Sequence, residues 1–184
     1  MISLSWLMLS AAAFQTSVDA KVRAISDGPA IFFNLCGATV TAVESPLDIA
    51  AYKFTKLDPK TFEDVRPGDT GPYWDVQGLK SGTRTLVHIW PHGGCSVEIV
   101  EADEAEIRRS FDVALNEYAS ISQGSVERES DKIKDSDGKP MTSSQWRVRT
   151  PSGSYLYGLT TYPDARYMTQ HMMIVRKVDK LDHK

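Results

Sequence analysis

The sequence lacks the short motifs that mark the common catalytic and cofactor-binding sites. It contains no G-x-S-x-G, no H-E-x-x-H, no C-x-x-C and no G-x-x-x-x-G-K. These patterns hold, in that order, a nucleophilic serine, a zinc ion, a redox-active thiol pair and a nucleotide phosphate. Their absence argues against the corresponding enzyme classes, and we expect no cofactor and no metal.

The chain also lacks a strong excess of charge of either sign. Its 21 Lys and Arg residues and 24 Asp and Glu residues give a net charge of -3. A protein that binds nucleic acid needs a concentration of positive charge to meet the phosphates. We therefore expect no nucleic-acid partner.

Lysine and arginine are absent before Lys21, and this N-terminal stretch has the features of a secretory signal peptide. Its apolar run, 2–14, is interrupted by serines and is followed by Val18-Asp19-Ala20, a small-residue cleavage pattern. The run is shorter than the roughly 20 residues that cross a bilayer about 30 Å thick, so we expect no stable membrane insertion. We predict a signal peptide at 1–20 and a single domain at 21–184, periplasmic or secreted. A buried N-terminal helix is the alternative.

Cysteine is scarce, since only Cys36 and Cys95 occur. An even number of cysteines in an exported chain predicts a disulfide, which here would join the N-terminal segment to a hairpin. Closing a loop of about 60 residues stabilises a fold by roughly 4 kcal/mol in the chain-entropy treatment. The alternative is a pair of buried free thiols.

The stretch 84–118 carries the clearest pattern in the chain, that of strand, turn, strand and helix. Apolar and polar residues alternate on both sides of a turn at 91–94, which predicts a β-hairpin. With Trp90 opposite Cys95, a single face of the hairpin would form the core, made of Leu86, His88, Trp90, Cys95, Val97 and Ile99. Asp103 is placed to cap a helix, with Glu106 three residues later. That helix carries an apolar stripe for a sheet, namely Ile107, Phe111, Ala114, Leu115 and Tyr118.

Elsewhere the pattern predicts further strands, with short helices near the N-terminus. Helices are expected at 27–37 and 45–56, while 58–82 is a long loop unless it contains a strand at 73–77. Strands are expected at 126–133, 146–150, 155–160 and 168–178, the first as a charged edge strand and the last as a central one. The predicted class is α+β. It comprises an antiparallel sheet of about five or six strands, one long amphipathic helix packed on it and one or two short N-terminal helices.

The histidines are the only candidates for acid-base or metal chemistry. His88 and His92 flank the hairpin turn, and His171 lies in the central strand, so the three would converge if those strands were neighbours. A strand and a turn have no fixed ligand geometry, however, unlike two histidines one helical turn apart. We therefore interpret His88 as a core residue and keep a small hydrolase or metal site as the alternative.

Aromatic and arginine side chains suggest a binding surface. Tyr73 and Trp74 are expected to be exposed in the long loop, and Arg147 and Arg149 to project from the C-terminal sheet with Tyr155 and Tyr157 nearby. Aromatic residues and arginine are enriched at the centres of protein interfaces, and a plain solvated sheet face is the alternative. We predict a soluble, exported, non-enzymatic domain that binds a protein or a cell-envelope component.

Overall fold

The computed structural model describes residues 27–37, 52–58, 60–63, 71–77, 84–90, 93–134, 138–166 and 169–178. The signal peptide predicted at 1–20 lies outside these residues, as do His92 and most of the helix predicted at 45–56. The signal peptide, His92 and the part of that helix before residue 52 are therefore not tested by the structure.

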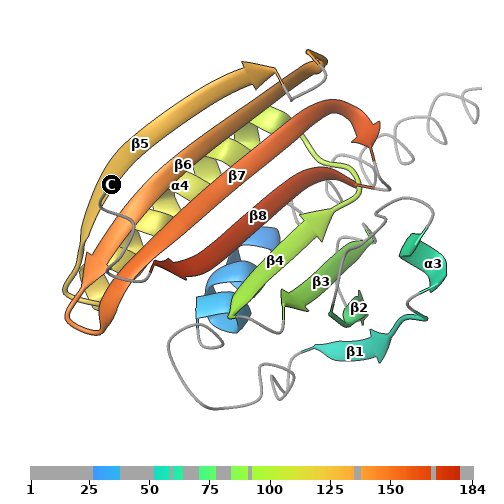
Figure 1. The fold of residues 1–184 in the computed structure, drawn as a ribbon, viewed down its shortest axis with the longest axis horizontal. Helices are drawn as coiled ribbons and strands as arrows, with labels where there is room; N and C mark the ends of the chain where they lie inside the picture. The colour runs from blue at the N-terminus through green and yellow to red at the C-terminus, as the bar shows by residue number, and fades with distance from the viewer. Residues whose placement is uncertain are drawn as a thin grey trace, which may run out of the picture.

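A single antiparallel sheet organises the part of the chain that the structure describes (Figure 1). The strand order is β1-β2-β3-β4-β8-β7-β6-β5, and every neighbouring pair is antiparallel. The expectation of five or six strands was too low, because the described residues form eight. The strands are β1 Lys53–Lys56, β2 Tyr73–Gln77, β3 Thr85–Trp90, β4 Gly94–Ile99, β5 Ser125–Lys134, β6 Pro140–Thr150, β7 Gly153–Arg166 and β8 Thr169–Val178.

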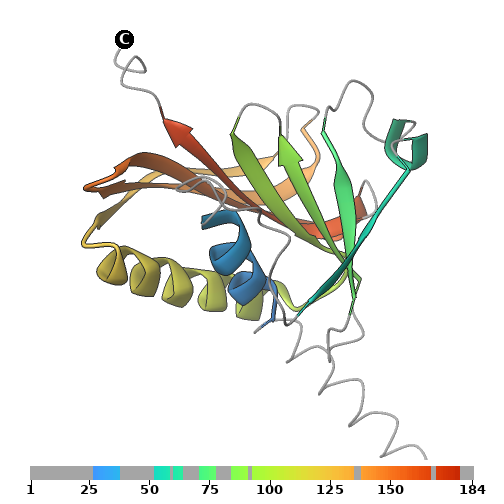
Figure 2. The same cartoon turned by 90° about the horizontal axis from the view of Figure 1, so that it is seen from below.

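Two helical segments lie on the same face of this sheet (Figure 2). The first covers residues 27–37 and contains the π-helical turn η1, Phe32–Cys36; the second is α4, Glu104–Ile121. A further short helix, α3, covers Lys60–Glu63 beside β1. Helix and sheet thus occur together in an α+β arrangement in which the sheet dominates.

Helix α4 begins where its capping residues predict. The carboxylate of Asp103 accepts a hydrogen bond from the backbone N–H of Glu106 at 3.0 Å, which satisfies one of the free donors of the first turn. Four residues along one stripe then bury their side chains against the sheet: Ile107, Phe111, Leu115 and Ala119. The ring centroids of Phe111 and Trp146 of β6 lie 5.3 Å apart, which places α4 over the C-terminal half of the sheet.

The predicted disulfide between Cys36 and Cys95 is confirmed. It joins the last residue of η1 to β4, with the two Cα atoms 5.3 Å apart and both residues fully buried. Phe32 and Leu35 of η1 are fully buried beside it. The bond therefore fixes the N-terminal helical segment against the middle of the sheet.

The register predicted for the β3–β4 hairpin was wrong by one residue. Trp90 pairs with Gly94 and His88 with Ser96, while Cys95 pairs with Ile89. The turn is one residue shorter than expected, because Gly93 adopts a φ of 85° and donates its N–H to the carbonyl oxygen of Trp90. A slip of one residue turns a side chain to the other face of a strand. Leu86, His88 and Trp90 consequently point away from the helices, and Cys95, Val97 and Ile99 point toward them.

The end of the helix predicted at 45–56 is a β-strand in the structure, so this part of the prediction was wrong. The last residues of that range, Lys53–Lys56, form the edge strand β1, which pairs with β2. Residues 73–77, for which the sequence allowed either a loop or a strand, form β2. Phe54 lies beside Val76 and packs on the core cluster, so an alternating strand buries this phenylalanine as well as a helix would.

Candidate functional site

The two described histidines of the predicted cluster lie on opposite faces of the sheet. His88 of β3 points away from the helices, whereas His171 of β8 pairs with Ile99 and points toward them. Strand β4 lies between β3 and β8. Among the described residues, no three His, Cys, Asp or Glu side chains form a group that could hold a metal ion. His88 and His171 therefore cannot act on one substrate.

His171 forms a closed set of hydrogen bonds within the core. Its Nε2 lies 3.0 Å from the carbonyl oxygen of Ala102, and its Nδ1 lies 3.3 Å from the hydroxyl oxygen of Thr161. A neutral ring that donates from Nε2 and accepts at Nδ1 satisfies both contacts. Burial lowers the pKa of His171 below its ordinary value, although the bond to Ala102 opposes this shift. His171 is thus suited to a structural role in its neutral form.

This neutral histidine predicts a loss of stability in mild acid. Because folding lowers the pKa of His171, the unfolded chain binds more protons as the pH falls below about 6.5. The contribution of the neutral His171 ring to the free energy of unfolding is complete above that pH. Below it, this contribution falls by at most about 1.4 kcal/mol per pH unit. The free energy of unfolding, measured with urea at pH 7.5 and at pH 5.5, should differ less between the two pH values for His171→Gln than for the wild type. An equal difference in the two proteins would contradict the assignment.

His88 belongs to a buried polar cluster on the face away from the helices. Its ring stacks on Tyr73 with centroids 4.0 Å apart and meets Trp90 edge-on at 4.7 Å. Ser96 lies directly opposite His88, and the Ser96 hydroxyl donates to Glu98 at 3.4 Å. His88, Ser96 and Glu98 are all fully buried. A serine, a histidine and a carboxylate meet here, but the serine bonds to the carboxylate and no member is exposed to a substrate.

Gly71 closes over this cluster and explains part of its burial. A Cβ atom at Gly71 would lie 2.9 Å from Nε2 of His88 and 2.4 Å from the carbonyl oxygen of Ile89. The φ of 121° at this position also favours glycine. The backbone at Gly71 therefore approaches the His88 ring more closely than any other residue type would allow.

The aromatic residues predicted to form a binding surface are mostly inside the fold. Tyr73 is buried in the His88 cluster, and Trp74 is half-buried on the helix-facing side of β2. Tyr155 and Tyr157 are buried beneath the helices, where Tyr157 pairs with Trp146. Tyr157 also stacks on Phe33 at 5.8 Å. Tyr155 and Tyr157 therefore do not contribute to an exposed surface beside Arg147 and Arg149, because β7 turns these two side chains to the core.

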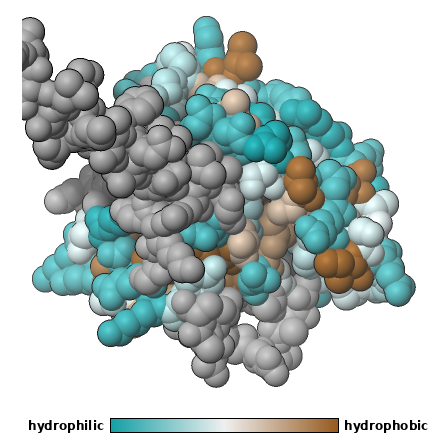
Figure 3. Space-filling model, turned by 180° about the vertical axis from the view of Figure 1, so that it is seen from behind, coloured by the Kyte–Doolittle hydropathy of each residue, from teal (hydrophilic) through white to brown (hydrophobic). Residues whose placement is uncertain are grey.

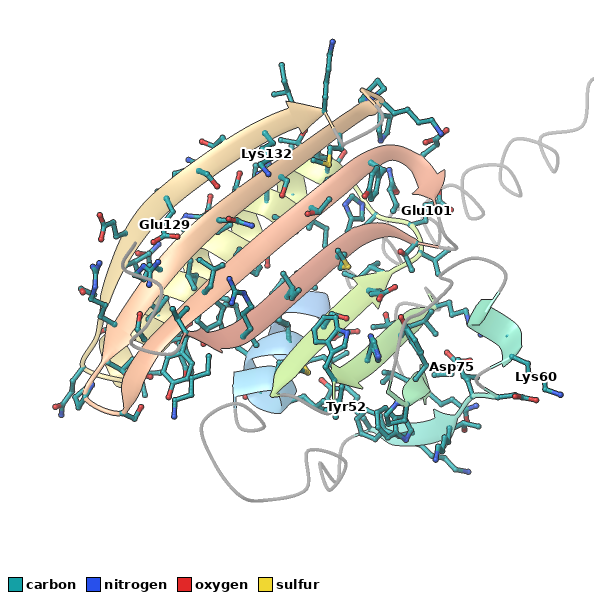
Figure 4. The ribbon with its side chains drawn as sticks, in the orientation of Figure 1. Tyr52, Lys60, Asp75, Glu101, Glu129 and Lys132 are labelled. Carbon is teal, nitrogen blue, oxygen red and sulfur yellow. A yellow bond between two sulfur atoms is a disulfide. The ribbon has the colours of Figure 1, made fainter. Side chains whose placement is uncertain are left out.

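Arg147 and Arg149 lie on the outer face of β6, as predicted, but each pairs with a glutamate of the edge strand β5. Arg147 binds Glu129, which is labelled in Figure 4, and Arg149 Nη1 lies 2.6 Å from Glu127 Oε2. These pairs neutralise the charge of the arginines. The six residues Tyr73, Trp74, Arg147, Arg149, Tyr155 and Tyr157 thus do not form one exposed basic and aromatic patch.

Among the residues that the structure describes, a groove between the two helical segments forms an open, concave site. It encloses about 450 Å³, a volume within the usual range of ligand sites. Figure 3 faces the helical side of the molecule and shows apolar patches among the polar surface. The groove is lined by Pro29, Ala30, Phe33, Asn34, Ser110, Val113, Ala114, Glu117, Tyr118 and Ile121. We refer to this surface as the helix groove.

Helix α4 supplies the helix groove with a second apolar stripe that the sheet does not cover. Val113 is 61% exposed and Ile121 is 77% exposed, although both are large apolar residues. They stand eight residues apart, with Glu117 midway between them, so the three share one side of the helix. Phe33 and Tyr118 form an aromatic wall, with ring centroids 5.6 Å apart.

The helix groove was not predicted from the sequence, although the sequence contains one signal for it. Val113 and Ile121 fall outside the stripe that packs on the sheet, and two bulky apolar residues there have no role in the core. The opposite wall comes from a segment about 80 residues earlier in the chain. Its position depends on packing and on the Cys36–Cys95 bond, which a local pattern does not show.

Comparison with known protein families, with curated proteins and with solved structures gave no match for this chain. Within the described residues, no helix has the length and apolar character needed to cross a membrane. The helix groove must therefore be interpreted from its own shape and chemistry.

Proposed function

We propose that this chain is an exported, non-enzymatic domain that binds a protein or a cell-envelope component at the helix groove. The observation that carries the proposal is the exposure of Val113 and Ile121 beside a concave apolar surface. Soluble domains seldom leave such residues grouped in the open, and an apolar patch with a polar border is characteristic of interaction sites. Fully burying one such side chain is worth about 1.5–3 kcal/mol.

Two features support the exported part of the proposal. The disulfide between Cys36 and Cys95 suits an oxidising compartment, and the N-terminal 20 residues have the pattern of a signal peptide. The alternative of a hydrolase or metal site at His88, His92 and His171 has less support, because His88 and His171 face opposite sides of the sheet.

The proposal predicts that one substitution in the helix groove abolishes binding without unfolding the protein. Ile121→Lys places a charge in the apolar contact and should reduce capture of partners from native envelope extract by about tenfold or more. Ile133→Lys is the matched control, because Ile133 is 74% exposed but lies on β5, away from the helix groove.

The measurement is the set of proteins retained on immobilised wild type and on the two variants, with circular dichroism as the check on folding. The proposal requires partners that Ile121→Lys loses and Ile133→Lys keeps. If both variants retain every partner that the wild type retains, the helix groove is not the binding site.

A further inference from the structure

We infer that the partner of the helix groove is a helical protein segment whose apolar residues flank a lysine or arginine. This inference rests on the proposed function and names the chemistry of its partner. The side chain that decides it is Glu117, the only charged side chain among the described residues that line the groove. Glu117 is exposed and forms no ion pair with the other residues that the structure describes.

The spacing of the exposed residues fits a helical partner. Val113 and Ile121 are eight residues apart on α4, which corresponds to about 12 Å along the helix axis. Apolar residues seven apart on a partner helix span about 10 Å, so two of them would contact Val113 and Ile121 together. A basic residue between those two would then lie beside Glu117.

Glu117 also argues against a second copy of this chain as the occupant. In a twofold dimer centred on the helix groove, the residue midway between Val113 and Ile121 lies near the symmetry axis. Glu117 would therefore face the Glu117 of the other copy, and two like charges in a contact that excludes water repel each other.

The same charge argues against an anionic lipid surface and against the N-terminal apolar run. A lipid headgroup that carries a negative charge would be repelled by Glu117, which stands in the middle of the exposed apolar residues. The run 2–14 is apolar enough for the groove but contains no lysine or arginine to pair with Glu117. A basic amphipathic segment of another protein satisfies both the apolar and the charged parts of the surface.

Two labelled peptides test this inference by fluorescence anisotropy with the full chain as recovered after expression. Both are helical, about 15 residues long, with leucines seven apart; one carries lysine between the leucines and the other glutamate. We expect the lysine peptide to bind about three- to tenfold more tightly at low salt. The difference should fall toward zero at about 1 M salt, where charges are screened within about 3 Å.

Charge reversal supplies the decisive comparison. Glu117→Lys should invert the preference so that the glutamate peptide binds more tightly, while Ile121→Lys should weaken both peptides and Ile133→Lys neither. Equal affinities for the two peptides in wild type and in Glu117→Lys would overturn the inferred partner, yet sensitivity to Ile121→Lys would leave the proposed function standing. Absence of binding of either peptide up to about 1 mM would also overturn the inference. So would a dimer, seen by sedimentation, that Ile121→Lys dissociates, because it would identify a second copy as the occupant.

Discussion

Replacing Cys36 and Cys95 together with alanine is expected to lower the free energy of unfolding by about 4 kcal/mol. The two residues are 59 positions apart, and removing a bond across such a loop returns conformational entropy to the unfolded chain. Total stabilities of about 5–15 kcal/mol are typical, so the loss should be a large fraction of the whole. The measurement is urea unfolding of the wild type and of the double variant.

The wild type unfolded in the presence of a reductant is the control for this prediction. It has the same chain entropy as the double variant but keeps both sulfur atoms, so its urea midpoint should lie close to that of the variant. A double variant within about 1 kcal/mol of the oxidised wild type would show that packing alone holds η1 on the sheet. The Cys36–Cys95 bond would then have no important part in forming the helix groove.

Phe111→Ala is expected to cost about 3–5 kcal/mol of stability, the second large effect. Phe111 is fully buried on α4, and its ring centroid lies 5.3 Å from that of Trp146 on β6 and 5.8 Å from that of Phe32 on η1. One side chain thus joins the sheet, α4 and the N-terminal helical segment. Its removal leaves a cavity where these three elements meet.

Val113→Ala is the matched control on the same helix. Val113 is two residues from Phe111 but largely exposed, so its truncation should change stability by less than about 0.5 kcal/mol. Chemical denaturation of both variants, at constant slope against urea concentration, measures the difference. Similar losses for the two substitutions would show that α4 is not anchored through Phe111.

Features that are marked by particular residues close together in the sequence, or by the number of one residue type, could be predicted. Asp103 and Glu106 mark the start of α4, and the charged residues of β5 mark an edge strand, which is where β5 lies. The pairing of Cys36 with Cys95 was predicted from an even count of cysteines in a chain with a signal-peptide pattern. Each of these features depends on neighbouring residues or on a count, so the sequence contains the necessary information.

Features that depend on tertiary contacts could not be predicted in the same way. The φ of Gly93 shortens the hairpin turn by one residue and so moves His88 to the other face of the sheet. Tyr157 lies in an alternating strand whose two faces look alike in sequence, and only the position of the helices shows which face is buried. The helix groove exists for the same reason, because its two walls come from distant parts of the chain.

Photo-crosslinking in cells that produce the protein shows directly whether the helix groove is the binding site. A photoreactive amino acid is placed either at Val113 in the groove or at Ile133 on β5, two exposed apolar positions. We expect a discrete adduct with another protein from position 113 only, and its loss when Ile121→Lys is added. No adduct from position 113, or the same adduct from both positions, would contradict this expectation.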